Sequence, residues 1–277
     1  MFTAYHITCT PSLTEIVLAL LADAGFDSFE ETEQGITAYG ASSEAAEHLE
    51  VLEELADRFS FVFTAEEMEM RNWNEVWEKS FSPIRVGCRL AIRATFHPAL
   101  TNVEHDLVID PKMSFGTGHH ATTHMMCELL LAYIPDASQA PDRVLDYGCG
   151  TGVLGILSLR LGAHQVDAVD IEEWAVENSA ENALANGVRF NQLKVGNLEE
   201  ILTGNPYDLV LANINRNVLL DSGEALWNNI RKGGRAFLSG ILRHDEEMVV
   251  EHYRRLGFTK LRTVAREDWR AVELLRE

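Results

Sequence analysis

Residues 144–152 read Val-Leu-Asp-Tyr-Gly-Cys-Gly-Thr-Gly, and this stretch decides the fold expected of the 277-residue chain. Its apolar first half is typical of a buried strand. Gly148, Gly150 and Gly152 let the backbone turn sharply and approach a ligand closely. The apolar run that follows predicts a helix, whose first turn carries unpaired N–H groups. A second apolar run ends in Asp170, where a carboxylate can accept hydrogen bonds from a ribose diol.

The glycines fit two cofactor motifs, which differ in where the loop begins. Gly150, Gly152 and Gly155 spell the dinucleotide fingerprint G-x-G-x-x-G, with Asp170 at the spacing of its ribose-binding acid. The other register, Asp-x-Gly-x-Gly-x-Gly from Asp146, resembles the first motif of class I S-adenosylmethionine-dependent methyltransferases. That ligand carries a sulfonium, an amino group and a carboxylate, so an acidic strand end suits it better than it suits two phosphates. We therefore favour a methyltransferase over an oxidoreductase.

From residue 119 on, helical and strand patterns alternate along the chain. The expected helices span 119–134, 152–162, 172–186, 217–231 and 245–256, and the expected strands span 143–147, 165–170, 192–196, 207–213 and 235–240. This alternation predicts a parallel sheet with helices on both faces. Two last strands, 258–265 and 269–275, predict an antiparallel terminal hairpin. The expected class is α/β, a Rossmann-like class I methyltransferase domain, preceded by β-rich segments within 84–110.

The first 64 residues predict a separate, small ferredoxin-like α+β domain. Expected strands cover 2–10, 29–33, 36–39 and 59–64, and expected helices cover 11–24 and 44–58, the second capped by Ser43. The order β-α-β-β-α-β is that of a split βαβ sandwich. Residues 65–82 predict a linker helix with Met70, Trp73 and Trp77 at helical spacing, and residues 83–277 form the larger domain.

Charge and composition exclude several classes of protein. The chain holds 23 Lys and Arg against 43 Asp and Glu, a net charge of −20, and residues 1–80 alone carry 17 acidic and three basic residues. Such a chain is a poor non-specific binder of nucleic acid. Its acidic first domain either attracts a basic protein or merely keeps the chain soluble. No apolar run of membrane-spanning length is present, and the four cysteines lie far apart, so we expect a cytoplasmic protein without disulfides or zinc.

Two further segments carry polar side chains toward the predicted site. Residues 209–214, Leu-Val-Leu-Ala-Asn-Ile, form a strand that ends in Asn213, whose carbonyl either accepts a hydrogen bond from an amine or caps the next helix. Residues 110–123 place glycines around Thr117 and a pair of threonines at the start of a helix. We interpret them as a loop that closes over the cofactor. His120 and His124 also have the spacing of a metal pair, but no third ligand is evident.

Together these segments resemble the bacterial ribosomal protein L11 methyltransferase family. The resemblance covers nearly the whole chain and rests on residues 115–123, 146–152, 212–214 and 238–241, with Asp170. It implies that residues 1–64 recognise a protein substrate and that residues 83–277 catalyse methyl transfer to lysine. It also implies that Thr123, Gly148, Asp170 and Asn213 contact S-adenosylmethionine. Departures from the family pattern occur at Lys112, Ala121 and the pair Asn215-Arg216.

The expected reaction is displacement of the sulfonium methyl by a lysine amine, repeated up to three times, with S-adenosylhomocysteine as the product and no metal. Asn213 is the candidate for orienting the amine. The residues expected at the cofactor are Phe115, Thr117, Thr123, Asp146, Gly148, Gly150, Gly152, Asp170 and Asn213. The expected partner is a basic protein of the large ribosomal subunit, with no nucleic acid and no membrane. The alternatives are a class I methyltransferase with another protein or small-molecule substrate, and a non-catalytic cofactor-binding adaptor.

Overall fold

The chain divides into two units, Met1–Ser80 and Phe81–Glu277. The structure is a computed structural model that describes residues 2–26, 28–32, 35–67, 82–110, 112, 114–202 and 204–277. Most of the predicted linker helix, residues 68–81, lies outside the described residues. Residues 65–67, where that helix was expected to begin, instead continue a strand, because they extend the antiparallel ladder with Thr3, Ala4 and Tyr5.

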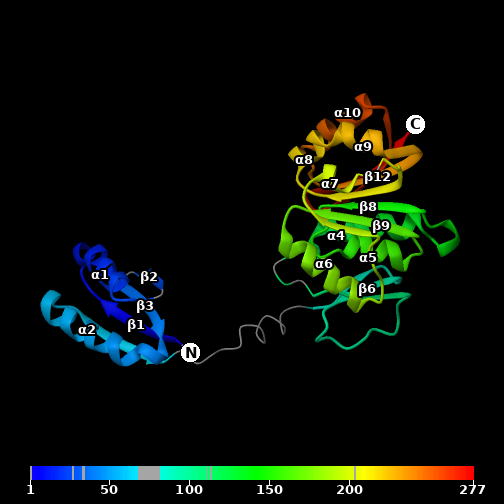
Figure 1. Ribbon diagram of the computed structural model, residues 1–277. Coiled ribbons are helices and arrows are strands. Elements are labelled where there is room, and N and C mark those ends of the chain that lie inside the picture. Colours follow the sequence, from blue (N-terminus) through cyan, green and yellow to red (C-terminus); the bar gives the residue numbers. More distant parts are fainter. Residues whose placement is uncertain are drawn as a thin grey trace. The chain divides into compact units, whose positions relative to one another are not determined.

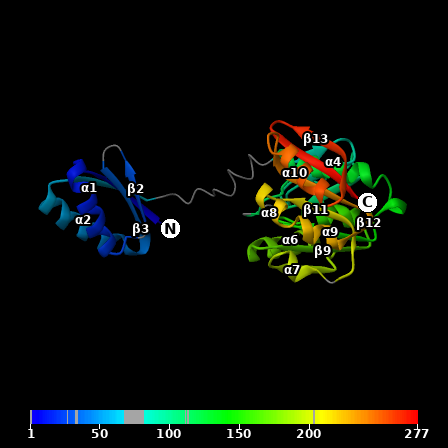
Figure 2. The ribbon, with the colours of Figure 1, turned by 90° about the horizontal axis from the view of Figure 1, so that it is seen from above.

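The first unit has the predicted order of strands and helices. Its elements are β1 (Phe2–Thr8), α1 (Pro11–Asp23), β2 (Ser28–Thr32), β3 (Gly35–Ala41), α2 (Ala45–Phe59) and β4 (Val62–Glu67). The sheet order is β2-β3-β1-β4 and every pair is antiparallel. Both helices cover one face, where Tyr5 and Ile7 pack with Leu21 and Leu52 (Figure 2). Ser43 does not cap α2, because it lies inside a short 3-10 turn and Glu44 occupies the cap position.

The second unit is built on a seven-stranded sheet in the order β10-β9-β8-β11-β12-β14-β13. Its strands are β8 (Arg143–Tyr147), β9 (Gln165–Asp170), β10 (Gln192–Val195), β11 (Tyr207–Asn213), β12 (Ile230–Leu242), β13 (Phe258–Arg266) and β14 (Trp269–Arg276). The first five are parallel, while β14 pairs antiparallel with both β12 and β13. The predicted terminal hairpin is confirmed, with its second strand inserted into the sheet.

Helices cover both faces of this sheet, as the alternating pattern predicts (Figure 1). They are α4 (Ala121–Tyr133), α5 (Val153–Arg160), α6 (Glu173–Ala185), α7 (Leu198–Ile201), α8 (Arg216–Asp221), α9 (Gly223–Asn229) and α10 (Glu246–Arg255). Alternate strand residues enter opposite cores: Val144 and Leu209 pack with α4 and α5, whereas Leu145 and Val210 pack on the side of α7 to α10. None of the described helices is long and apolar enough to cross a membrane.

The helix predicted over 217–231 is wrong in its length. It is divided at Ser222 into α8 and α9, and Ile230 already belongs to β12. The Ser222 hydroxyl donates to the carbonyls of Val218 and Leu219, at 2.6 and 3.3 Å, and such back-bonding competes with continued helix. A Cβ on Gly223 would lie 2.7 Å from His252 Nε2, so the break also lets α10 approach closely.

A separate three-stranded sheet precedes the large sheet in the chain. It comprises β5 (Ile84–Val86), β6 (Leu90–Arg93) and β7 (His105–Val108), in that order, with β5 antiparallel and β7 parallel to β6. Its apolar side chains, including Ile92 and Leu107, share a core with Met125 of α4. The residues after β7 therefore start from a fixed support beside the large sheet.

Candidate active site

The glycine loop after β8 is fixed by its own conformation and by two neighbouring segments. Gly148, Gly150 and Gly152 have φ angles of +71°, +54° and +77°, in the left-handed region that glycine tolerates best. A Cβ on Gly148 would lie 2.3 Å from Ile214 Cγ2, and one on Gly150 would lie 2.3 Å from the carbonyl oxygen of Phe115. The loop thus brings together the segments after β11 and before α4, as well as starting α5.

Asp170 lies at the end of β9, against this loop. Its Oδ2 accepts a hydrogen bond from the Gly150 N–H at 2.8 Å, and its Oδ1 accepts one from the Glu172 N–H at 3.2 Å. The carboxylate is half-buried, so it is fixed in place while part of it stays accessible. This is the position from which an acid can bind the hydroxyl groups of a ribose.

Exposed apolar side chains surround Asp170, and the sequence analysis missed them. Ile171 is 65% exposed, Trp174 is 41% exposed, and Val195, which lies opposite Asp170 on β10, is 46% exposed. Large apolar groups beside a carboxylate suit a ligand with a flat ring next to a sugar. In the sequence, the only sign of this apolar surface was Ile171 directly after Asp170. That sign is weak, because single exposed apolar residues are common on protein surfaces.

Asn213 and Thr123 meet at the carboxyl edge of the sheet. The Asn213 Nδ2 donates to Thr123 Oγ1 at 3.2 Å, and Thr123 is fully buried in the first turn of α4. The Asn213 Oδ1 is buried and has no hydrogen-bond partner within the described part of the chain. A buried carbonyl without a donor is costly unless a ligand supplies one. The pair therefore fits an amine or hydroxyl group that enters from outside the protein.

The loop before α4 is bound to the glycine loop through Thr151. The Thr151 N–H donates to the Phe115 carbonyl at 2.9 Å, and its hydroxyl donates to the Gly116 carbonyl at 2.8 Å. The Phe115 side chain is 52% exposed, at the rim of the site. The Thr117 hydroxyl pairs with His119 Nδ1 at 3.0 Å.

The two histidines with metal-like spacing each have a protein partner. His120 caps α4 by accepting a hydrogen bond from the Thr122 N–H at 3.3 Å. His124 Nε2 lies 3.4 Å from Glu128 Oε1, one turn further along the same helix. Among the described residues there is no group of three side chains placed to hold a metal ion.

Asp146 is buried beneath the other predicted residues. It is 1% exposed, and its Oδ2 accepts a hydrogen bond from the Gly155 N–H at 2.8 Å. Burial raises the pKa of Asp146 to about 7, an effect that the Gly155 N–H opposes and nearby Asp170 reinforces. This geometry suits a residue that supports the start of α5.

Side chains of α6 also hold the glycine loop, and the sequence analysis missed them. The Ser179 hydroxyl donates to the Gly150 carbonyl at 2.8 Å, and the Asn182 amide donates to the Thr151 carbonyl at 2.9 Å. Asn178, Asn182 and Asn186 recur every four residues and are all buried. That spacing was the available signal, since one helix face of asparagines needs backbone partners when it is buried.

The segment after Asn213 is tied to the loop after β12. Arg216 donates to Asp245 Oδ1 at 2.7 Å, and Asn215 caps α8 by accepting from the Val218 N–H at 3.1 Å. A Cβ on Gly240 would lie 2.1 Å from the Ile214 carbonyl oxygen, so β12 also approaches closely. The departures Asn215 and Arg216 therefore brace the segment that carries Asn213.

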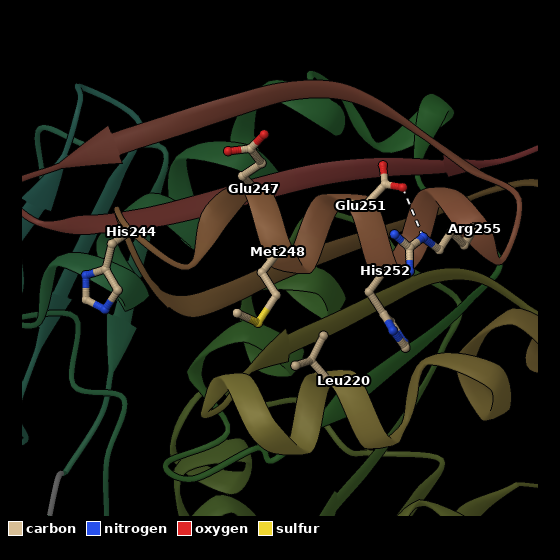
Figure 3. A pocket seen from close by; sticks show the side chains of 7 residues that line it. All are labelled: Leu220, His244, Glu247, Met248, Glu251, His252 and Arg255. Atoms are coloured by element: carbon tan, nitrogen blue, oxygen red, sulfur yellow. Dashed lines mark hydrogen bonds and ion pairs between the residues drawn. The ribbon is translucent and has the colours of Figure 1, made fainter.

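A groove of about 520 Å³ lies elsewhere, on the outer face of α8 and α10 (Figure 3). Met248 and Leu220 lie toward each other across it, and Glu251 bonds to Arg255 at its rim. None of the predicted site residues lines this groove. The site described above is instead formed by loops at the carboxyl edge of the sheet, where ligands of open α/β sheets bind.

The fold and the site together define a class I methyltransferase. In this sheet β14 lies between β12 and β13 and runs antiparallel to both. The sheet therefore differs from the all-parallel sheet of dinucleotide-binding oxidoreductases. The comparisons agree: a family model described as "Ribosomal protein L11 methyltransferase (PrmA)" matches residues 16–277. The chain belongs to the ribosomal protein L11 methyltransferase family.

Two relatives align with nearly the whole chain, and one solved structure aligns with most of it. A ribosomal protein L11 methyltransferase of Porphyromonas gingivalis is 38% identical over 262 residues, which are 93% of this chain and 89% of the relative. One from Bacteroides fragilis is 36% identical over 96% of this chain and 95% of its own length. The crystal structure of a ribosomal protein L11 methylase from Lactobacillus delbrueckii subsp. bulgaricus is 27% identical, with a TM-score of 0.62 over 71% of this chain and all of that one.

Proposed function

We propose that this chain transfers methyl groups from S-adenosylmethionine to lysine amino groups of ribosomal protein L11, up to three on one lysine. The observation that carries the proposal is the buried Asn213 Oδ1, which has no partner among the described residues and lies beside Thr123. A carbonyl oxygen in that position can accept a hydrogen bond from an amine. Family membership supports L11 as the substrate.

The residues present fit S-adenosylmethionine. Asp170 offers an acceptor for the ribose hydroxyls, and Ile171 and Val195 offer apolar surface for the adenine. Gly148 and Gly150 have no side chains, so a ligand can approach the backbone closely at these two positions. When bound, S-adenosylmethionine supplies a methyl group on a cationic sulfonium, and S-adenosylhomocysteine remains. Phe115, Thr123, Gly152 and Asn213 complete the proposed binding set, while Asp146 supports it from below.

Asn213 orients the lysine amine without taking its proton, because an amide does not titrate. At pH 7 a lysine with a pKa of about 10.4 is neutral in only about one molecule in 2,500. The attacking nitrogen needs its lone pair, so the ammonium must lose a proton to solvent before it attacks the methyl group. We therefore expect the transfer rate to rise with pH toward the pKa of the lysine.

The first unit is proposed to recognise a basic protein. Residues 1–80 carry a net charge of −14, and α2 presents Glu47, Glu50, Glu53 and Glu54 to solvent. Such a surface attracts a basic partner over distances of about a Debye length, or ~10 Å at 0.1 M salt. The same charge opposes contact with nucleic acid.

The test is methyl transfer from labelled S-adenosylmethionine into a mixture of purified ribosomal proteins and ribosomal RNA. We expect the label in L11 alone. Asn213→Ala should abolish it, whereas the control Asn229→Ala should not, because the Asn229 amide donates to the Ala225 carbonyl at 2.8 Å within its own helix, α9. Label in RNA, or in several proteins without L11, would contradict the proposal.

A further inference from the structure

We infer that Thr151 and Asn182 act as a latch that holds Asp110, Phe115 and Gly116 against the glycine loop and so positions Phe115 at the cofactor. Neither residue is expected to touch the reacting atoms, and both act through backbone groups of other residues. The inference rests on the proposed function, since it assigns these two residues to the retention of S-adenosylmethionine and S-adenosylhomocysteine in the same site.

Thr151 forms the first half of the latch. It is fully buried, and its N–H and hydroxyl donate to the consecutive carbonyls of Phe115 and Gly116, at 2.9 and 2.8 Å. The two segments are in close contact, because a Cβ on Gly116 would lie 2.8 Å from Thr151 Oγ1. Two donors on one residue thus fix both the position and the direction of the backbone that carries the Phe115 ring.

Asn182 forms the second half. It is 2% exposed, and its amide nitrogen donates to the Thr151 carbonyl at 2.9 Å and to the Asp110 carbonyl at 3.3 Å. Its Oδ1 accepts from the Asp110 N–H at 3.0 Å. One side chain therefore joins the glycine loop to Asp110. Asn182 holds Asp110, Thr151 holds Phe115 and Gly116, and the bond from Asn182 to the Thr151 carbonyl connects the two contacts.

The same hydrogen-bond network includes groups that the ligand is proposed to contact. Gly150, next to Thr151, donates its N–H to Asp170 and accepts from Ser179 at its carbonyl, both at 2.8 Å. A displacement of Thr151 therefore moves the Gly150 N–H, which holds the proposed ribose-binding Asp170, as well as the Phe115 backbone. Largely buried hydrogen-bond networks of this kind favour one geometry, and the loss of a single member loosens the rest.

Asn186 provides a matched control one helical turn away. It is also buried, at 7% exposure, and it makes the same kind of paired contact with the Val108 N–H and carbonyl, at 2.9 and 2.7 Å. It contacts the strand before the site and donates to the Asn182 backbone carbonyl at 2.7 Å, but within the described residues it makes no hydrogen bond to the glycine loop. Replacing Asn186 should therefore cost stability comparable to replacing Asn182 without changing ligand retention.

The experiment measures the release of S-adenosylhomocysteine from the full-length chain by stopped-flow fluorescence, with the partly exposed Trp174 as the native reporter. The variants are Thr151→Val, Thr151→Ser, Asn182→Ala and Asn186→Ala. The valine removes one buried hydrogen bond at nearly constant volume, and the loss of that bond should speed release about tenfold. The serine should restore release to within about twofold, because it keeps the donor. Asn182→Ala should speed release at least as much as Thr151→Val, and Asn186→Ala should leave it unchanged.

A second measurement needs no ligand. In amide hydrogen exchange the Thr151 N–H should exchange faster in Asn182→Ala than in the wild type, although its acceptor, the Phe115 carbonyl, is untouched by the substitution. Thermal unfolding of Asn182→Ala and Asn186→Ala then shows whether the two are equally destabilised. Should Asn182→Ala not fold, the comparison of Thr151→Val with Thr151→Ser still decides the question.

The latch and the proposed function fail in different ways. If the wild type binds S-adenosylhomocysteine but Thr151→Val releases it at the wild-type rate, the latch is wrong and the proposed function stands. If Asn186→Ala speeds release as much as Asn182→Ala, the effect is general destabilisation and the latch is also wrong. If the wild type binds neither S-adenosylmethionine nor S-adenosylhomocysteine, the proposed function is overturned and the latch with it.

Discussion

The amide nitrogen of Asn213 lies 3.2 Å from the hydroxyl oxygen of Thr123, although 90 residues separate them in the chain. This contact fixes the orientation of the Asn213 amide and turns its carbonyl oxygen into a buried acceptor without a donor in the described residues. Asn213 at the end of β11 and Thr123 at the start of α4 would not indicate a binding site if each were taken alone. Together they form a neutral, pre-oriented acceptor at the edge of the sheet, which is what alignment of an amine requires.

Removing the Thr123 hydroxyl should release the Asn213 side chain. We expect Thr123→Val to lower kcat for methyl transfer on the order of tenfold or more, because one buried hydrogen bond sets the orientation of the acceptor. Thr123→Ser should recover most of the rate. Steady-state kinetics with L11 check this, and equal rates for the valine and serine variants would show that the contact has no part in the reaction.

Asp170→Ala should weaken S-adenosylmethionine binding by about 1.5–3 kcal/mol, the range for a hydrogen bond to a charged acceptor. Asp170→Asn should lose less, since it retains an oxygen for the Gly150 N–H, which now lies 2.8 Å from the carboxylate. Titration calorimetry gives both affinities. An unchanged affinity in the alanine variant would rule out the ribose assignment.

Asp146 should make the folded protein less stable as pH rises toward neutrality. Its folded pKa is raised to about 7, above the unfolded value of about 3.9, so the folded state binds the proton more tightly. The stabilising contribution is fully present below pH 4 and is lost as pH rises to 7. Asp146→Asn cannot titrate, so its stability relative to the wild type should increase from pH 4 to pH 7 in urea unfolding. A constant difference across that range would contradict the raised pKa.

The acidic face of α2 should accelerate association with L11. We expect Glu47, Glu50 and Glu54 replaced together by Gln to lower the association rate and its salt dependence, with little effect on dissociation. The matched control replaces Glu199, Glu224 and Glu247, three exposed acids of the second unit, and changes the net charge equally. Stopped-flow association at several salt concentrations separates the two. Equal effects of both triple variants would mean that only total charge matters.

The sequence predicted the elements whose cause is local. Alternating apolar runs gave the strands β8, β9 and β11, and the residues at their carboxyl ends, including Asp170 and Asn213, meet at one edge because the strands are parallel. The glycine loop was also predictable from local sequence, since Gly148, Gly150 and Gly152 all adopt the positive φ angles that glycine tolerates best. The predicted linker helix over residues 68–81 stays a prediction.

What the sequence did not predict depends on contacts between distant segments. The four-residue spacing of Asn178, Asn182 and Asn186 marks one helix face, but the partners of Asn182, Asp110 and Thr151, become visible only in the fold. The break at Ser222 has a local part, the bonds of its hydroxyl to Val218 and Leu219, but the close approach of His252 to Gly223 depends on the packing of α10, which no local pattern reports. The side-chain partner of Thr117, His119, is likewise set by the path of its loop, while the assignment of Thr117 to the cofactor stays a prediction.

The most direct test of the central claim is the intact mass of purified L11 after incubation with S-adenosylmethionine and the full-length chain, followed by fragmentation to locate the added groups. The account predicts successive methyl additions on lysine with the wild type, and none with Asn213→Ala at a concentration of S-adenosylmethionine that saturates that variant. L11 of unchanged mass with the wild type, or methylation that proceeds equally with Asn213→Ala, would contradict it.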